Sequence, residues 1–216
     1  LIEADSATYE REFVVQVTDS QGVGIPNAPV QLSVRSKLYI KGRYKPVDNF
    51  WGPRGDSISC PDEDLDASGQ LEDIGERIED YNNSGSMEAG NIVSVSPGDL
   101  VTDQFGRAIF RIAYAQEFGN WAVVTIKARV QVQGTEFEDA SDHALEITAA
   151  DANTSQPPPG GLVSRFGGFD LEQELDGADP VLSLVDPVSG LPLPRLIRLQ
   201  ELGFGNGRYL GCRTLD

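Results

Sequence analysis

The chain has few of the side chains on which common catalytic and metal sites depend. It contains one histidine and two cysteines among 216 residues, and the cysteines are far apart in sequence, which argues against a zinc site with nitrogen and sulfur ligands. A serine or cysteine nucleophile would also need a histidine base, and His143 lies at the edge of a predicted strand, where a surface or capping role fits better. A pair of carboxylates of the glycosidase type is the catalytic arrangement that the composition leaves open. We therefore expect a protein that is not an enzyme.

Membrane and export signals are also missing from the residues given. No stretch approaches the roughly 20 apolar residues of a membrane-spanning helix. Residues 1–20 lack the basic start, apolar middle and small-residue cleavage site of a signal peptide, and the first residue is Leu1. We expect no membrane insertion by this chain, and we expect a processed product or a fragment whose export signal lay upstream.

Positive charge is scarce. Seventeen Lys and Arg stand against 34 Asp and Glu, which leaves a net charge of −17. A surface this negative repels phosphate backbones and anionic lipid head groups, so nucleic acid is not an expected partner. The same charge favours hard cations such as calcium.

Several short segments alternate apolar and polar residues and end in turn-forming residues. This pattern is typical of half-buried strands. Strands rich in Val and Ile, separated by Gly, Pro, Asn and Asp, favour an all-β protein built as an antiparallel sandwich. The expected strands are residues 12–18, 29–35, 91–96, 107–114, 121–132 and 144–148.

The composition divides the chain into three parts. We expect a β-sandwich over residues 1–150, interrupted by a long insert at 36–90. Residues 151–216 begin with three consecutive prolines among small polar residues and glycines, which favours an extended linker. The apolar segments of the tail that follows are broken by prolines, so we expect extended pieces that bind against another surface rather than a separate domain.

The insert becomes strongly acidic from Cys60. Residues 60–91 contain ten acidic residues and one arginine, which accounts for −9 of the net charge. They also contain an internal repeat, because DLDASGQLE from Asp64 matches DYNNSGSME from Asp80 at an offset of 16 residues. Such a concentration of carboxylates needs a counterion or extensive hydration.

Each copy of the repeat has the spacing of a calcium-binding loop. Oxygen-bearing side chains stand at positions 1, 3 and 5, glycine at 6, a backbone carbonyl at 7 and glutamate at 9. The predicted ligands are Asp64, Asp66, Ser68, Gln70 (carbonyl) and Glu72 in the first loop, and Asp80, Asn82, Ser84, Ser86 (carbonyl) and Glu88 in the second.

Calcium takes six to eight oxygens, so each loop needs a further ligand, and Glu76 and Asn91 are the candidates. Position 12 counted from Asp64 is Gly75 and no helices flank the loops, so the pair is not an EF-hand and is more similar to thrombospondin repeats. We predict two calcium sites within residues 62–91. The alternative is a solvated acidic loop without metal.

Cys60 and Cys212 are compatible with one disulfide in an oxidising compartment or with two unrelated buried thiols. We favour the disulfide, which would close a loop of roughly 150 residues and contribute roughly 5 kcal/mol in the chain-entropy model. Trp51 lies in the loop DNFWGPRG. It is a candidate either for ligand contact, for example stacking on a sugar, or for covering the insert.

The strands together with their turns resemble bacterial Ig-like domains of the invasin and intimin type. The motifs are VQVTDSQGVGIPNAPVQLSV, VTDQFGRAIFRIAY and GNWAVVTIKA. More narrowly, the chain is similar to a subgroup of exported proteobacterial Ig-like proteins with an Asp/Asn/Gly-rich insert led by a cysteine. That subgroup usually has Asn where this chain has Ser68 and Ser84. The residues that match the Ig-like pattern are Asp19, Gly22, Pro26, Val30, Thr102, Asp103, Gly106 and Ala108.

The resemblance implies a non-catalytic, calcium-stabilised Ig-like module of a cell-surface or extracellular protein. Such a module serves adhesion or forms a filament subunit that assembles through its tail. The expected partners are neighbouring Ig-like domains, identical subunits, or a glycan or protein of a host or cell surface. Two alternatives stay open: a calcium-dependent carbohydrate-binding module, and a tail that packs on its own domain.

Overall fold

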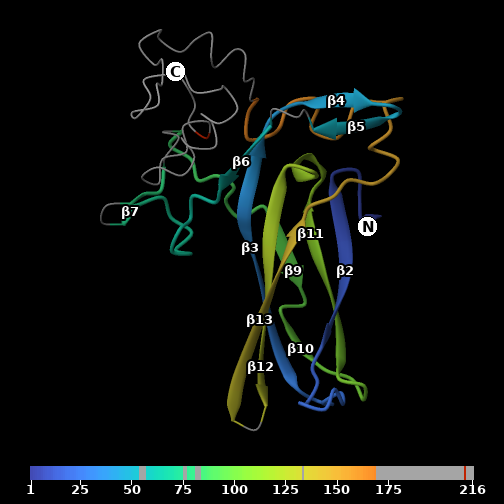
Figure 1. The fold of residues 1–216 in the computed structure, drawn as a ribbon, viewed down its shortest axis with the longest axis vertical. Coiled ribbons are helices and arrows are strands. Elements are labelled where there is room, and N and C mark those ends of the chain that lie inside the picture. Colours follow the sequence, from blue (N-terminus) through green and yellow to red (C-terminus); the bar gives the residue numbers. More distant parts are fainter. Residues whose placement is uncertain (54–56, 75–76, 81–83, 133, 169–211, 213–216) are drawn as a thin grey trace, which may run out of the picture.

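The protein is an antiparallel β-sandwich from whose upper end the acidic part of the expected 36–90 insert projects (Figure 1); this part, residues 60–91, is called the insert from here on. The computed structural model describes residues 1–53, 57–74, 77–80, 84–132, 134–168 and 212. Within these ranges the helical structure consists of one 3₁₀ turn at Gln116–Phe118 and the isolated Cys212, and no helix is long and apolar enough to cross a membrane.

Two sheets form the layers of the sandwich. The first has the order β1–β2–β11–β9, and the second has the order β10–β3–β12–β13, with β6 paired to the far end of β3. Two further hairpins, β4–β5 and β7–β8, lie outside the layers. The strands are β1 (Ile2–Glu3), β2 (Thr8–Gln16), β3 (Pro29–Lys41), β4 (Tyr44–Val47), β5 (Phe50–Pro53), β6 (Ile58–Pro61), β7 (Asp73–Ile74), β8 (Arg77–Ile78), β9 (Val93–Ser96), β10 (Asp99–Val101), β11 (Arg107–Ala115), β12 (Ala122–Val132) and β13 (Thr135–Ala144).

The core lies between the two sheets and follows from the alternation along each strand. In β11 the buried residues Phe110, Ile112 and Tyr114 alternate with Ile109 and Arg111, which face solvent. Successive side chains of a strand point to opposite faces, so one face of β11 packs on the core and the other stays exposed. The predicted all-β, Ig-like antiparallel sandwich is confirmed.

The strand expected at 12–18 is β2, which lies slightly earlier at Thr8–Gln16, and two other expected strands depart further from the observed limits. The strand expected at 29–35 continues to Lys41, where its last residues pair with β6. The strand expected at 144–148 is wrong, because the chain forms β13 just before it. Gly134, at φ +80°, turns the chain so that β13 pairs with β12 as a hairpin. The side chains of β13 are nearly all exposed, so this edge strand lacks the alternation that would have revealed it.

At the lower end of the sandwich, hydrogen bonds from side chains stabilise the β2–β3 and β10–β11 connections and join them to each other. Asp19 accepts hydrogen bonds from the backbone of Gln21 and Val23, and Asp103 does the same for its own turn. Thr102 Oγ1 accepts from the Ala28 amide at 2.9 Å and donates to the Ile25 carbonyl at 2.7 Å. The sequence pattern Asp-x-x-Gly is therefore a pair of side-chain-capped turns.

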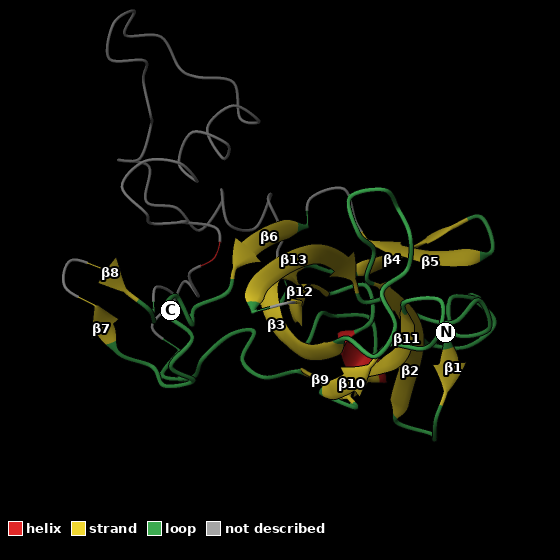
Figure 2. Cartoon of the chain, turned by 90° about the horizontal axis from the view of Figure 1, so that it is seen from below, coloured by secondary structure: helices red, strands yellow, loops and turns green. Residues whose placement is uncertain are grey.

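Residues after the sandwich return along the β4–β5 hairpin. The amide of Trp51 donates to the Ala152 carbonyl, that of Tyr44 to Leu162, and that of Gly42 to the carbonyl of Gly167. The β4–β5 hairpin and the insert extend to opposite sides of the upper end of the sandwich, as two perpendicular views show (Figures 1 and 2).

Candidate metal centre

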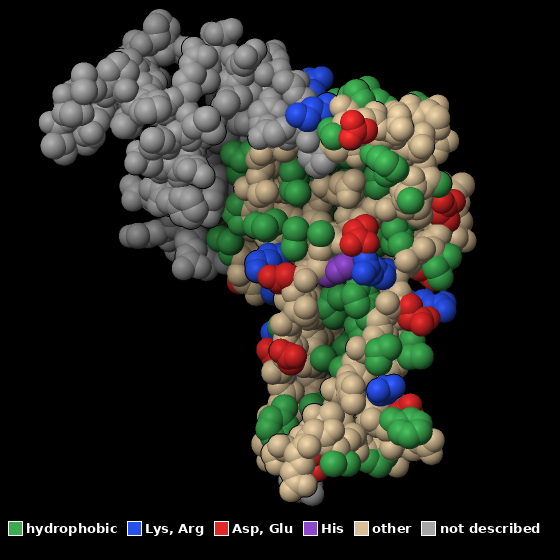
Figure 3. Space-filling view, turned by 45° about the vertical axis from the view of Figure 1, so that its right-hand side comes forward, with side chains coloured by type: hydrophobic (Ala, Val, Ile, Leu, Met, Phe, Trp, Pro, Cys, Tyr) green, Lys and Arg blue, Asp and Glu red, His purple; other side chains and the backbone are tan. Residues whose placement is uncertain are grey.

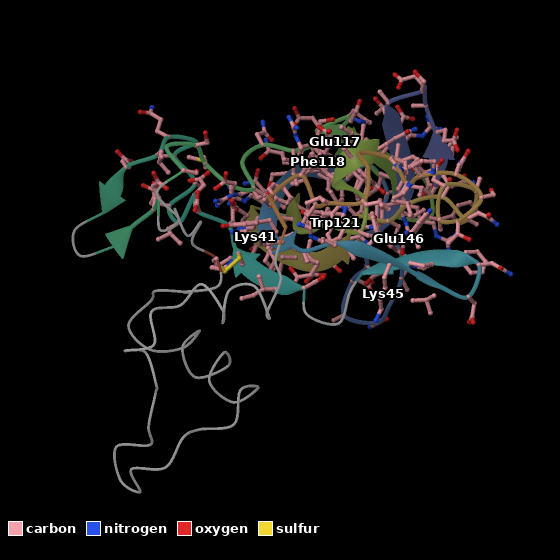
Figure 4. All side chains as sticks on the ribbon, turned by 90° about the horizontal axis from the view of Figure 1, so that it is seen from above. Lys41, Lys45, Glu117, Phe118, Trp121 and Glu146 are labelled. Carbon is pink, nitrogen blue, oxygen red and sulfur yellow. A yellow bond between two sulfur atoms is a disulfide. The ribbon has the colours of Figure 1, made fainter. Side chains whose placement is uncertain are left out.

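The disulfide between Cys60 and Cys212 lies at the base of the insert (Figure 4). Both cysteines are fully buried, next to Tyr39 and Ala89 and with Phe166 packed against them. The predicted disulfide is confirmed. It ties the end of the chain to the strand from which the insert begins.

Side chains and backbone of β3 bind both ends of the insert. The Arg35 guanidinium donates to the Asp64 carbonyl at 3.0 Å and lies 3.7 Å from Asp64 Oδ2. Ser36 Oγ donates to the Gly90 carbonyl at 2.7 Å, and the Asp62 amide donates to Lys37 O at 3.0 Å. The extension of β3 beyond residue 35 therefore provides the support on which the insert rests.

The two repeats of the sequence are also repeats of structure. The glycine at position 6 has nearly the same backbone angle in each loop, with φ +72° at Gly69 and +71° at Gly85. Each glycine amide donates to the first aspartate of its own loop, Gly69 to Asp64 at 3.3 Å and Gly85 to Asp80 at 2.9 Å. The sharp turn and the inward position of the first carboxylate are thus shared by both loops.

The serine at position 5 is equally conserved in geometry between the loops. Ser68 Oγ accepts from the Gln70 amide at 3.1 Å and donates to the Gln70 carbonyl at 3.2 Å. Ser84 makes the same two bonds with Ser86, at 3.1 and 2.9 Å. Two predicted ligand oxygens, the hydroxyl and the carbonyl of position 7, therefore lie next to each other in each loop.

Three carboxylates converge in the first loop. Oxygens of Asp64, Asp66 and Glu79 all lie within 4.8 Å of one another. Asp64 Oδ1 is buried and has no hydrogen-bond partner among the described residues. A buried carboxylate oxygen without a donor is costly, and a cation is the natural partner for three converging carboxylates. Two of the three residues were predicted from the sequence, and the third was not.

The unpredicted member, Glu79, is completely buried. It precedes the second loop in sequence, yet its carboxylate accepts hydrogen bonds from the first loop, from the amides of Leu65 and Glu72 at 3.0 Å each. Glu63, which precedes the first loop, is also completely buried and accepts from the Glu88 amide of the second loop at 2.9 Å. Glu63 and Glu79 are related by the same offset of 16, which was the signal for them in the sequence.

Burial changes the acidity of the residues at the start of the insert. It raises the pKa of Glu63 to about 8, with a further contribution from the nearby charges of Glu88 and Asp80. It also raises the pKa of Asp62 to about 6, although the Ala89 amide opposes the shift by donating to the Asp62 carboxylate. The protein alone therefore stabilises these carboxylates poorly in their charged form.

The remaining predicted ligands differ in how the structure places them. Glu72 binds Glu79 through its backbone amide, and the Glu88 carboxylate accepts from Ser84 Oγ at 3.1 Å within the second loop. Asn91 is exposed where the insert returns toward β9. Glu76 and Asn82 lie outside the described residues.

Trp51 is separate from the acidic loops. It lies on the β4–β5 hairpin, where its Nε1 donates to the Gln156 carbonyl at 2.7 Å. This hairpin and the insert lie on opposite sides of the sandwich end (Figure 2). Trp51 therefore covers the segment after the sandwich and does not cover the insert.

The donor set selects the class of metal. The converging groups are carboxylates, with hydroxyl and carbonyl oxygens in the same loops and no nitrogen or sulfur ligand. All-oxygen sites of this kind suit hard cations, and a loop that supplies several protein oxygens suits calcium better than magnesium, which retains its waters. The residues present fit calcium.

Comparison with known proteins adds little beyond the fold. No family model matches the chain, and no curated protein matches it. A search of solved structures finds the ASH/PapD-like domain of human CEP192 (PapD-like domain 7), which is 11% identical over 65% of this chain and 75% of that chain, with a TM-score of 0.30. A match at this level carries no functional information.

Proposed function

We propose that the chain is a calcium-stabilised Ig-like module of a bacterial cell-surface or extracellular protein, of the invasin and intimin type, with a structural or adhesive and non-catalytic role. The observation that carries the proposal is the first loop. There Asp64, Asp66 and Glu79 bring their oxygens together and one oxygen of Asp64 is buried without a partner. A bound calcium ion supplies that partner and neutralises the self-repulsion of the insert.

The disulfide and the calcium loops support a location outside the cytoplasm. Disulfides persist in oxidising compartments, and the Cys60–Cys212 bridge lies at the base of the calcium loops. Calcium that binds only the folded state stabilises it by about 2.7 kcal/mol when its concentration is a hundred times Kd. Extracellular calcium would thus keep the insert folded after export.

Calorimetric titration of chelator-stripped protein with calcium tests the proposal. We expect two ions per chain in the wild type and the loss of one in Asp64→Asn. Asp139→Asn is the matched control, because Asp139 is an exposed acidic residue on β13, far along the sequence from the loops. Absence of heat of binding in the wild type would reduce the insert to a solvated acidic loop and remove the proposed function.

The sandwich also supports assembly through the tail. A groove of about 880 Å³ runs between β2 and β13, floored by core residues such as Phe110 and Ile126. Figure 3 shows hydrophobic side chains gathered on this side of the sandwich. Among the described strands, β13 pairs only with β12, and β2 pairs with β11 and, at one end, with β1. Both walls therefore present backbone groups to which an added strand could bond.

The charged residues that line the groove are all acidic, Asp19, Glu138, Asp139 and Asp142. Two of them already form salt bridges, Asp142 with Lys37 and Glu138 with Lys127 and Arg129, so Asp19 and Asp139 carry the argument from charge. The tail segment 194–200, PRLIRLQ, combines apolar residues with two arginines and no acid, and it lies outside the described residues. We propose that this segment of one copy adds to the groove of the next and so builds a filament. Sedimentation velocity of Ile197→Asp against Ser189→Asp tests this: assembly is lost in the first variant only. A wild type that stays monomeric in calcium would contradict it.

The alternative of a calcium-dependent carbohydrate-binding module finds no support in the site. It needs calcium and an aromatic platform at one place, but the β4–β5 hairpin, which carries Trp51, and the acidic loops lie on opposite sides of the sandwich end (Figures 1 and 2). A glycan array with and without chelator separates this alternative from the proposed role.

A further inference from the structure

The two loops contact each other through the glutamates that precede them. These contacts bear on which residues complete the coordination shell of a calcium ion in each loop. Each loop offers about five oxygens of its own, and calcium takes six to eight. The inference below rests on the proposed calcium binding and concerns which residues supply the missing ligands and how the two sites influence each other.

Glu79 directly precedes the second loop in the sequence, but its carboxylate contacts the first loop. Its two carboxylate oxygens accept from the Leu65 and Glu72 amides, at positions 2 and 9 of the first loop. The same carboxylate lies within 4.8 Å of oxygens of Asp64 and Asp66. A carboxylate oxygen has two lone pairs, so one that accepts an amide can also coordinate an ion. Glu79 is thus positioned both to shape the first loop and to complete its metal site.

Glu63 makes the reciprocal contact. Its Oε2 accepts from the Glu88 amide, which is position 9 of the second loop, and its own amide donates to the Glu88 carbonyl at 2.7 Å. Its Oε1 is buried and has no hydrogen-bond partner among the described residues. Glu63 is completely buried, so this oxygen is hidden from solvent as well. An unpartnered carboxylate oxygen at this position is available to a cation in the second loop.

We propose that the two calcium sites exchange ligands, Glu79 completing the ion of the first loop and Glu63 the ion of the second. Each of these glutamates is followed directly by the first aspartate of its own loop, Asp80 and Asp64. An ion that holds Asp64 in place therefore also holds the preceding Glu63 in contact with the second loop. An ion that holds Asp80 in place likewise holds Glu79 in contact with the first loop. The two sites consequently fill cooperatively, as one unit.

The reciprocal contacts also replace the further ligands expected from sequence. Asn91 is exposed, whereas both glutamates are completely buried and bonded across the pair. Glu76 lies outside the described residues. Glu76→Gln therefore tests Glu76 as the rival ligand, and Asp139→Asn, at an exposed position on β13, is the control that removes one negative charge away from the loops.

The experiment measures metal affinity at the second loop in variants that lack a ligand of the first loop. Tyr81 occupies position 2 of the second loop, where the first loop has Leu65, so terbium luminescence excited through tyrosine reports on the second site. Tyr81→Phe confirms the source of the signal. The full disulfide-bonded chain is titrated with terbium, and with calcium in competition, as wild type, Asp64→Asn, Glu63→Gln, Glu79→Gln, Glu76→Gln and the control Asp139→Asn.

We expect Asp64→Asn to weaken the second site about tenfold, which is a coupling of ordinary size between two binding sites. Glu63→Gln weakens that site as well. Glu79→Gln reduces the calorimetric stoichiometry by the ion of the first loop, whereas Glu76→Gln retains that ion and Asp139→Asn changes neither site. An affinity of the second site that is unaffected by Asp64→Asn, or a loss in Glu76→Gln equal to that in Glu79→Gln, would overturn the inference while leaving calcium binding intact. Absence of any binding in the wild type would instead remove the proposed function. Circular dichroism of each variant verifies that the sandwich is folded.

Discussion

The sandwich and the insert bury opposite kinds of side chain. The fully buried residues between the sheets are apolar or aromatic, such as Tyr9, Ile112 and Val124, whereas the fully buried residues of the acidic loops are Glu63 and Glu79. Apolar burial stabilises the sandwich without any ligand. Buried carboxylates stabilise a structure only when hydrogen bonds and a cation compensate them. The comparison sets a region that apolar burial stabilises without a ligand beside a region whose order, in the proposed role, depends on an ion.

We expect the largest loss of stability when the disulfide that links the two regions is removed. Replacing both cysteines, Cys60→Ser with Cys212→Ser, opens a loop whose ends are 152 residues apart in sequence. In the chain-entropy model we expect a loss of about 5 kcal/mol in the free energy of unfolding. Urea unfolding of the double variant beside the oxidised wild type measures it. A loss below about 1 kcal/mol would show that the unfolded chain gains little freedom when the bridge is absent.

A substitution in the apolar core should lower the stability of the sandwich and leave calcium affinity unchanged. Ile112→Ala removes a completely buried side chain from β11, and we expect it to cost about 3 kcal/mol of unfolding free energy. Ile109→Ala, on the same strand but 57% exposed, is the control, and we expect a change below about 0.5 kcal/mol. Calcium affinity should stay the same in both. A drop in affinity in Ile112→Ala would mean that the two regions are not energetically separate.

The smallest expected effect is a change in calcium affinity when one predicted ligand of the insert is replaced. Ser68→Asn replaces a hydroxyl ligand by an amide oxygen, which is a better calcium ligand and can still accept from the Gln70 amide. We expect calcium affinity to rise several-fold and the melting temperature in chelator to stay unchanged. Ser68→Ala is the matched control and should bind less tightly. Equal affinity in the three proteins would show that position 5 does not coordinate the ion.

The sequence predicted what depends on local periodicity. Along β11 and β12 every second residue is apolar and turned toward the core, so these strands and the sandwich they form were predictable, as was the cysteine bridge. The edge strand β13 was missed because its exposed side chains carry no alternation. The positions of Glu63 and Glu79 were missed for a different reason. Their partners lie in the opposite loop, and a buried carboxylate cannot be told from an exposed one by residue type.

Hydrogen–deuterium exchange of the full chain, in calcium and in chelator, tests the central claim most directly. We predict that amides of residues 62–74 and 84–91 are protected in calcium and exchange rapidly in chelator. Those of β11 and β12 should remain protected in both conditions, because each strand pairs with a neighbour on both sides and packs on the apolar core. Equal protection of the insert with and without calcium would contradict the account, since it would mean that the buried glutamates are stabilised by the protein alone.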